Sequence, residues 1–320
     1  MNVTDLKCFF LDVYWEQTGR DVTASVLSCV VTSLFALTAI LGNGIVMLVI
    51  RKTRELHSPS FTLLFCLAAS DLLVGLVVQP CFVAYKVAKL LDHFSAYCKL
   101  RMTQFFSGWI TSGVSLLTLT GVCFDRLLAL TLHLRYSSLI TVPRVAIVIA
   151  GVWIICSAGT IIKFWFDKWV ILPSIVVVAT LLIIAFCTSK IFQIALRHQR
   201  QINTQDQTMT NLQNNTVEVL KCKNSAITVL YVYGLLLAFY LPFLVAMVLE
   251  TINGTTRSVE MAYDYATTVV LINSSINPII YCWRIKLVRS AVKQYLKRLF
   301  FCKKVSQTGV QRCKIVWAVT

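Results

Sequence analysis

The stretch Asn277-Pro278-Ile279-Ile280-Tyr281 ends a long apolar run, and a basic amphipathic segment follows it directly. A proline in a helix that is buried in hydrocarbon frees a backbone carbonyl, which neighbouring helices, polar side chains or water must satisfy. Asn277 and Tyr281 place polar groups about one helical turn apart beside this proline. Because polar groups at membrane depth are expensive, the stretch indicates a moving part of a membrane protein.

The composition extends this interpretation to the whole chain. Hydrophobic residues make up 57% of the 320 residues and charged residues only 14%, which is too apolar for a soluble domain. A membrane-crossing helix needs about 20 apolar residues. The sequence therefore predicts an all-α membrane protein, a single bundle of seven transmembrane helices within residues 24–282. The predicted spans are 24–50, 59–86, 95–130, 143–165, 169–197, 219–250 and 259–282.

The charges predict the orientation in the membrane. The first 23 residues carry four acids and two bases, whereas residues 283–320 carry ten Lys or Arg and no acid. The positive-inside rule therefore places the tail 1–23 outside and the tail 283–320 in the cytosol. The net charge of +16 favours anionic membrane lipid and cytosolic partners over nucleic acid, because the cations lie beside the spans. Residues 198–217 are rich in Gln, Asn and Thr and predict a cytosolic loop.

Residues 284–299 predict a short amphipathic helix on the cytosolic membrane surface, with an apolar stripe formed by Val288, Val292, Tyr295 and Leu299. Cys302 follows this helix and is a candidate for palmitoylation, with an unmodified thiol as the equal alternative. Asn2 and Asn253 begin glycosylation sequons on the predicted outer side.

Asp71 is the deepest charged residue of the predicted bundle. It lies inside the second span, where a carboxylate must be protonated, paired or bound to an ion; a neutral, hydrogen-bonded Asp71 is the simplest alternative. In the third span, Cys98 and Arg126 are 28 residues apart, about 42 Å along a helix. This length matches a bilayer with its headgroups, about 40–45 Å, so Asp125-Arg126-Leu127 lies at the inner mouth.

On these residues the chain resembles the rhodopsin-like G-protein-coupled receptors over nearly its whole length. Each matching motif alone is weak, but their order and spacing on seven spans make a specific signal. The absent fifth-span proline and the short outer loop are similar to the melanocortin, adenosine and lipid-receptor branch, which does not name a ligand. The matching motifs are Gly42-Asn43, Leu67 to Asp71, Asp125-Arg126-Leu127 (for the family's Asp-Arg-Tyr), Leu134-Arg135-Tyr136, Trp153, Phe239-Tyr240-Leu241-Pro242 and Asn277 to Tyr281.

The resemblance implies a plasma-membrane receptor that binds an extracellular ligand and activates heterotrimeric G proteins. Ligands would favour an active population, in which Arg126 parts from Asp125 and Tyr281 swings inward. The implied switch residues are Asp125, Arg126, Tyr240, Pro242, Asn277, Pro278 and Tyr281. The resemblance also implies an allosteric sodium ion and no other cofactor, and oxygen ligands around one carboxylate suit such a hard cation. The implied sodium ligands are Asp71, Ser115, Asn273, Ser274 and Asn277.

Several positions depart from the family's pattern. Tyr240 replaces the usual Trp before the sixth-span proline, and Thr180 and Thr188 align with the usual fifth-span proline and tyrosine. Cys222 occupies the position of the acidic lock, with Glu218 one turn away. A weakened lock predicts signalling without ligand.

An outer ligand cavity is predicted between the helices. Arg101, Gln104, Gly108 and Ser112 recur at a helical spacing and therefore share one face of the third span. With residues of the sixth and seventh spans they would line a cavity, although ordinary packing explains the aromatic residues equally well. The predicted lining is Arg101, Gln104, Gly108, Ser112, Tyr240, Phe243, Tyr263 and Thr267.

The resemblance also bears on the ligand. Gly108 stands where amine receptors carry an aspartate, which argues against a monoamine, and Leu271 stands at the retinal-binding lysine position, which argues against retinal. The cations that would favour an acidic ligand, or equally snorkel to the headgroups, are Lys86, Arg101 and Lys163.

The family's outer disulfide joins the third span to the loop after the fourth, but no cysteine lies between residues 157 and 186. Cys8 is a substitute partner for Cys98, and an unpaired Cys98 thiol is the equal alternative.

Three other functions compete with a signalling receptor. A transporter or channel would have charges along a pathway or an inverted repeat, and no repeat occurs. A binder that no longer signals fits the departures but not Asp125-Arg126 and Tyr281. An enzyme is the weakest, because no nucleophile or acid–base pair is recognisable.

Overall fold

The computed structural model describes residues 6–132, 135–162, 165, 171–205, 212–254 and 256–306. Within these ranges it describes all side chains except those of residues 6, 12, 198–205, 212–232 and 299–306. Several predictions therefore fall outside the described residues or side chains, namely those on Asn2, Leu134, Lys163, Glu218, Cys222 and Cys302.

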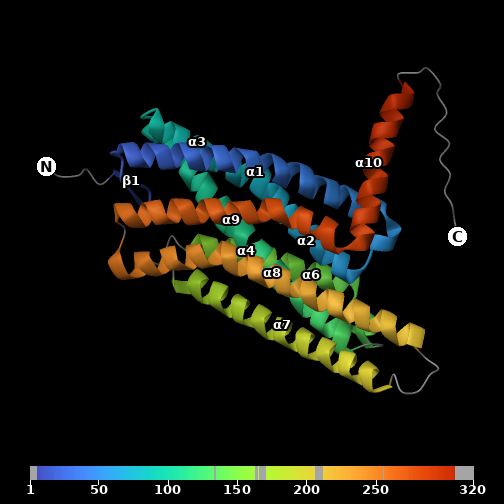
Figure 1. The fold of residues 1–320 in the computed structure, drawn as a ribbon. Coiled ribbons are helices and arrows are strands. Elements are labelled where there is room, and N and C mark those ends of the chain that lie inside the picture. The colour runs from blue at the N-terminus through green and yellow to red at the C-terminus, as the bar shows by residue number, and fades with distance from the viewer. Residues whose placement is uncertain are drawn as a thin grey trace.

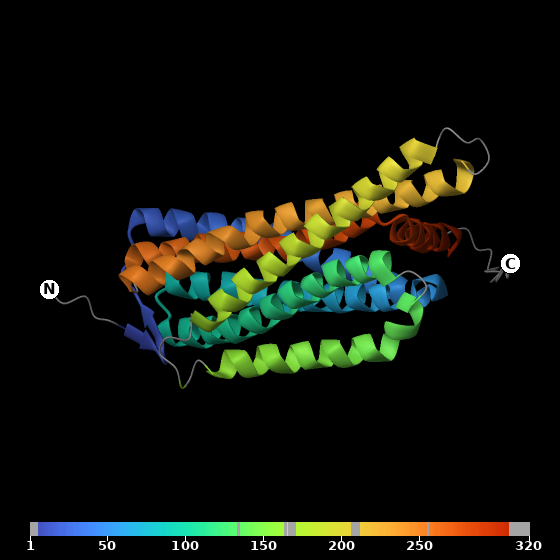
Figure 2. The same cartoon turned by 90° about the horizontal axis from the view of Figure 1, so that it is seen from below.

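Long helices run side by side along the bundle (Figures 1 and 2). They are α1 (Gly19–Lys52), α4 (Phe94–Leu132), α6 (Val142–Ile161), α7 (Ile171–Gln205), α8 (Leu212–Asn253) and α9 (Arg257–Arg284). One further crossing consists of α2 (Pro59–Leu73), the π turn η2 (Val74–Val78) and α3 (Gln79–Leu90). The short elements are β1 (Leu6–Cys8), β2 (Leu11–Val13), η1 (Arg54–Leu56) and α5 (Tyr136–Leu139), and α10 (Lys286–Ser306) ends the described chain.

The predicted seven-helix bundle is confirmed, although α9 is unlike the other crossings. Among the described residues, six helical segments are long and apolar enough to cross a membrane, and α9 is not one of them. Its polar side chains face inward: Asn273, Ser274, Ser275 and Asn277 are each 5% exposed or less. Because α9 packs between α1 and α8, these groups are covered by protein rather than lipid, which lowers the cost of their polarity.

The second crossing bends around a proline. Pro80 is the second residue of α3 and cannot donate a backbone hydrogen bond, and the π turn η2 lies directly before it. Gly75 in this turn lies against α1, where an added Cβ would come within 2.9 Å of Ile40 Cγ1 and 3.1 Å of Ala39 Cβ. The turn therefore brings the second crossing close to α1.

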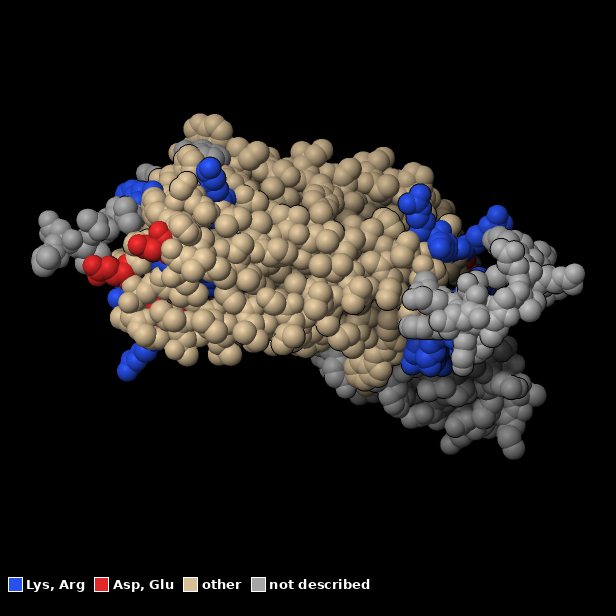
Figure 3. Space-filling view, turned by 90° about the horizontal axis from the view of Figure 1, so that it is seen from above, with Lys and Arg blue, Asp and Glu red and all other residues tan. Residues whose placement is uncertain are grey.

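The charged side chains gather at the two ends of the bundle (Figure 3). We call the end with β1 and β2 the hairpin end, and the end with α10 the tail end. Large apolar side chains are exposed between them, for example Ile147 at 72% and Leu182 at 66%, which suits a surface that faces lipid. The protein is therefore a multi-pass membrane protein.

Three predictions about the flanking segments need correction. The predicted loop 198–217 is helical over residues 198–205 and 212–217, because α7 and α8 continue beyond their apolar cores. The N-terminal tail contains a two-stranded hairpin, and α1 begins within it behind a capping box of Thr18 and Asp21. The stripe of α10 contacts protein as well, since Val288 is fully buried and packs with Val292 and Tyr295 against the bundle.

Candidate ligand cavity and activation switch

A cavity of about 760 Å³ opens among the helices toward the hairpin end, within the size range of small-molecule sites. The structure brings together all eight residues of the predicted lining: Arg101, Gln104, Gly108, Ser112, Tyr240, Phe243, Tyr263 and Thr267. Tyr240 lies 4% exposed at the wall shared by α8 and α4, with its hydroxyl 3.5 Å from the Ser112 carbonyl oxygen. The predicted aromatic residues therefore line a cavity and also pack against one another.

Gly108 has little room for a side chain. A Cβ at this position would lie 3.3 Å from the Gln104 amide nitrogen and 3.4 Å from Val78 Cγ1. Gln104 itself is 8% exposed. The Gln104 amide therefore occupies the space on the α4 wall that a side chain at position 108 would fill.

The N-terminal hairpin covers one side of the cavity. A disulfide joins Cys8 of β1 to Cys98 near the start of α4. The Phe10 ring contacts the rings of Phe105 at 5.4 Å and Phe106 at 6.2 Å between centroids. Apart from the possible pairing of Cys8, the sequence did not predict the β1–β2 hairpin, because strands of three residues are too short to show a periodic pattern.

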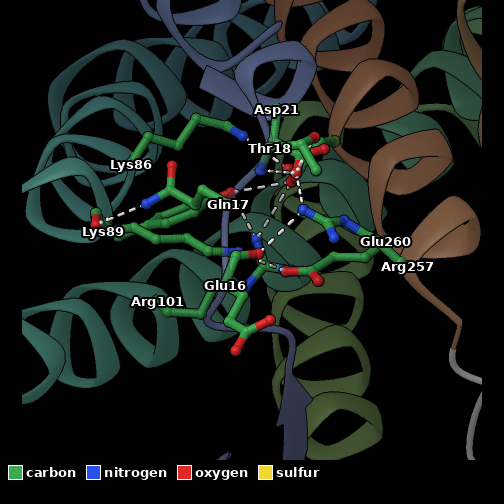
Figure 4. Close-up of polar contacts among 11 residues, drawn as sticks. Glu16, Gln17, Thr18, Asp21, Lys86, Lys89, Arg101, Arg257 and Glu260 are labelled. Atoms are coloured by element: carbon green, nitrogen blue, oxygen red, sulfur yellow. Dashed lines mark hydrogen bonds and ion pairs between the residues drawn. The ribbon is translucent and has the colours of Figure 1, made fainter. Parts of the chain in front are cut away.

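A network of ion pairs ties the helices together at the hairpin end (Figure 4). Lys86 Nζ lies 2.7 Å from Asp264 Oδ2, and Arg101 reaches the other oxygen of the same carboxylate at 3.7 Å. Lys89 pairs with Glu260 at 3.4 Å. Lys86 and Arg101 are therefore engaged with an acid within the protein and do not snorkel.

The same network reaches α1. Arg257 at the start of α9 pairs with Asp21 and also donates to the Glu16 carbonyl oxygen at 3.0 Å. Asp21 in turn accepts from the backbone nitrogen of Thr18 at 2.8 Å. The sequence does not predict these ion pairs, because only the tertiary arrangement brings Asp264, Glu260 and Asp21 near their partners.

Asp71 lies fully buried at the centre of the bundle. Ser115 donates to one carboxylate oxygen at 3.1 Å and the Asn277 amide to the other at 2.8 Å. The Ser274 side chain also interacts with this carboxylate, and the Ser70 hydroxyl lies 2.8 Å from that of Ser115. Four of the five predicted sodium ligands therefore meet here, whereas Asn273 is buried without a contact to Asp71 among the described hydrogen bonds.

A buried carboxylate beside two serine hydroxyls fits a small hard cation. Among the described side chains, no Lys or Arg comes within 4 Å of Asp71, so no described cation balances the charge of this carboxylate. The Asn277 contact is made by an N–H donor, which favours the carboxylate form but is not itself a cation ligand.

The seam between α1 and α9 adjoins this cluster. The Asn43 amide donates to the carbonyl oxygens of Ala39 at 2.9 Å and Ser274 at 3.0 Å. Gly42 lies against the proline of α9, where an added Cβ would come within 2.9 Å of Pro278 Cβ. The backbones of the two helices are therefore in near contact at the switch proline.

Gly42→Ala is expected to destabilise the protein, because the new methyl group must displace the Pro278 ring. Overpacking of this kind costs about 1–3 kcal/mol, more than the roughly 1 kcal/mol that alanine gains in a helix. Gly44→Ala is the matched control, since nothing lies within 4 Å of its added Cβ. Thermal unfolding of the purified variants should rank Gly42→Ala below wild type and Gly44→Ala at or above it; equal values for both variants would contradict the close contact.

At the tail end, the Asp125 carboxylate is engaged by neutral donors. Ser60 and Tyr136 each donate to it at 2.6 Å. Burial, followed by the Asp125 contact, raises the pKa of the Tyr136 hydroxyl, so this donor stays protonated. Among the described ion pairs none joins Asp125 to Arg126, and two hydroxyls satisfy the carboxylate in this structure. The release of Arg126 from Asp125 on activation stays a prediction.

Tyr281 is buried at 5% exposure, and its hydroxyl has no hydrogen-bond partner among the described side chains. A buried hydroxyl without a partner costs free energy. The position of Tyr281 therefore favours a second arrangement in which the hydroxyl is satisfied.

Comparison with known proteins settles the family. The family of the 7 transmembrane receptor (rhodopsin family) matches residues 42–174 and 163–281. The chain belongs to the rhodopsin family. This rhodopsin-family receptor is 25% identical to the histamine H2 receptor of Rattus norvegicus over 306 residues, 88% of this chain and 81% of that receptor. It is 34% identical to the 5-hydroxytryptamine receptor 1D of Mus musculus over 131 residues, 39% of this chain and 33% of that receptor.

The family resemblance drawn from the motifs is thereby confirmed, and the departures can be placed. Thr180 and Thr188 of α7 are buried and donate back to carbonyl oxygens of their own helix, Val176 at 2.9 Å and Ile184 at 2.7 Å. Both hydroxyls therefore bond within α7 and make no described hydrogen bond to another helix.

The predicted glycosylation residue Asn253 is exposed at the hairpin end, where Gly254 with φ of +67° ends α8.

Proposed function

We propose that this receptor lies in the plasma membrane, binds an extracellular ligand in the cavity and activates heterotrimeric G proteins from its tail end. The hairpin end then faces outward, in keeping with the basic residues of α10 on the other side. The observation that carries the proposal is a line of buried polar groups between the two ends. Tyr240 stands at the cavity, Asp71 lies fully buried with Ser115 and Asn277 as hydrogen-bond donors, and Tyr281 is buried one turn beyond Asn277 on α9.

The activation step would be a change in helix packing around α9. Pro278 interrupts the hydrogen bonding of α9, and Tyr281, one turn later, holds an unsatisfied hydroxyl. A ligand that favours an inward position of Tyr281 would shift the population toward the active state. Pro242 in α8 supplies the corresponding break beside Tyr240.

A sodium ion on Asp71 would favour the inactive state. Asp71 and the hydroxyl oxygens of Ser115 and Ser274 would hold it, and the ion would supply the positive charge that this carboxylate otherwise lacks. A sodium ion bound at Asp71 would hold α2, α4 and α9 together, because its ligands come from all three helices.

Basal signalling is also expected. Asp125 is already satisfied by Ser60 and Tyr136, so no described ion pair restrains Arg126. The inactive state is then held mainly by neutral contacts, and the signal should rise with receptor density in the absence of ligand.

The ligand class is a separate question. Both relatives are named for amines, histamine and 5-hydroxytryptamine, whereas Gly108 removes the acid that an amine would use on α4. The missing acid at position 108 argues only against an amine whose counter-ion would lie on α4. Retinal is disfavoured because Leu271, 3% exposed at the cavity wall, offers no amine.

The test is G-protein activation in cells across a panel of Gα subunits, with receptor expression titrated. Wild type should activate at least one subunit in proportion to its surface density, and Arg126→Ala should reduce that signal about 10-fold or more, because the variant lacks the cation that faces the G protein. Arg144→Ala, which removes an exposed guanidinium at the tail end, is the control for general charge. Silence of wild type at confirmed surface density would instead favour a binder that does not signal, and ion currents or solute uptake would favour a transporter.

A further inference from the structure

A row of aromatic rings crosses the cavity and ends on a carboxylate. Phe105 lies 6.2 Å from Trp109, Trp109 lies 5.4 Å from Phe243, and Phe243 lies 5.6 Å from Tyr263, all edge to face between centroids. The Tyr263 hydroxyl then donates to Glu250 Oε2 at 2.6 Å. Trp109, Phe243, Tyr263 and Glu250 all line the same cavity.

Glu250 differs from the other charged residues of this lining. Glu260 meets Lys89 at 3.4 Å, and Arg101 meets Asp264 at 3.7 Å. Lys7 also has an interaction partner. Among the described residues no Lys or Arg lies within 4 Å of Glu250, so the Tyr263 hydroxyl is its only described partner.

We propose that Glu250, Tyr263, Phe243 and Trp109 form a binding site for an organic cation, a protonated amine or quaternary ammonium with an apolar body. This inference rests on the proposed receptor function and assigns a ligand class to its cavity. Aromatic faces attract a cation within about 6 Å of the ring centroid, and the attraction strengthens where water is excluded. An unpaired carboxylate beside such rings completes the charge balance when the cation binds.

The rest of the lining suits the apolar body of such a ligand. Leu116, Val177 and Leu271 contribute apolar surface to the cavity. The carboxylate for the cation comes from Glu250 of α8 rather than from α4, where the Gln104 amide already fills the space beside Gly108. The missing acid of α4 therefore does not exclude a cationic ligand.

The experiment uses purified full-length receptor in lipid nanodiscs and matched probes of one shape. The probes are 2-phenylethylamine, trimethyl(2-phenylethyl)ammonium and the neutral 2-phenylethanol. Thermal unfolding as a function of probe concentration gives each affinity. The two cations should stabilise wild type at concentrations below about 10 mM, and the neutral probe should bind at least about 10-fold more weakly.

Variants separate the site from general electrostatics. Glu250→Gln should weaken binding of both cations about 10- to 100-fold, because a charge-assisted contact is lost. Glu250→Asp should restore part of that loss, and Tyr263→Phe should weaken binding less than Glu250→Gln. Glu260→Gln removes one negative charge from the same cavity and should change cation affinity less than about 3-fold.

Three outcomes would overturn the proposal: no cation binding by wild type up to about 10 mM, equal binding of 2-phenylethanol, or equal losses in Glu250→Gln and Glu260→Gln. Because binding is measured without a G protein, each of these outcomes would reject the cation site without rejecting the proposed G-protein activation, which is tested separately. If Glu250→Gln fails to unfold cooperatively, Glu250→Asp replaces it, and its affinity for both cations must fall below that of wild type or the proposal fails.

Discussion

Cys8→Ser is expected to release the N-terminal hairpin from the cavity. Two strands of three residues are marginal alone, and the disulfide to Cys98 closes a chain separation of 90 residues. The chain-entropy model gives such a closure about 4–5 kcal/mol. Amide hydrogen exchange over residues 6–13 should therefore accelerate about 1000-fold or more.

Two variants define what this result means. Cys81→Ser removes a free cysteine of α3 and should leave hairpin exchange unchanged. Phe10→Ala keeps the disulfide but removes the ring contacts with Phe105 and Phe106, so it should accelerate exchange by a smaller factor. If Cys8→Ser left the exchange of residues 6–13 as slow as in wild type, the hairpin would be held by something other than the disulfide.

Asp71→Asn is expected to abolish stabilisation by sodium. In wild type, exchanging choline chloride for about 150 mM sodium chloride should stabilise the protein by roughly 1–2 kcal/mol for a dissociation constant near about 10 mM. A gain of this size raises the unfolding temperature by about 3–6 °C. The asparagine variant keeps the shape of the side chain but lacks the charge that holds the ion, so its unfolding temperature should be equal in both salts.

The control for this prediction is Asp92→Asn. Asp92 also carries a negative charge, but it is exposed at the hairpin end, where it accepts a hydrogen bond from Trp15. This variant should keep the sodium response of wild type. A sodium response that survives in Asp71→Asn, or that is absent from wild type, would rule out the ion at this position.

The helices and much of the cavity could be predicted because their signals are periodic and local. Apolar runs give the spans, and the spacing of Arg101, Gln104, Gly108 and Ser112 places them on one helix face. The Asp71 cluster was predictable through the family resemblance, since its members lie at matching positions of three helices.

The contacts that depend on tertiary approach were not predictable. Nothing near Asp264 in sequence indicates that Lys86 and Arg101, about 160–180 residues earlier, share its carboxylate. Ser60 and Tyr136 reach Asp125 from separate elements, so the sequence does not indicate these two hydrogen bonds. Glu250 could not be predicted, because its significance comes from the lack of a cation near it among the described residues, which only the tertiary structure shows.

The polarity of α9 has a consequence for how the receptor is made. A helix that carries Asn273, Ser274, Ser275 and Asn277 within two turns enters hydrocarbon reluctantly by itself, and α9 follows the other described crossings in the chain. Its cover is α1, synthesised first, whose Asn43 and Gly42 meet the Ser274 carbonyl and Pro278. Membrane insertion of α9 thus depends on a docking site on α1 that must stay available throughout synthesis. A substitution that disrupts this site on α1 should therefore impair the membrane insertion of α9.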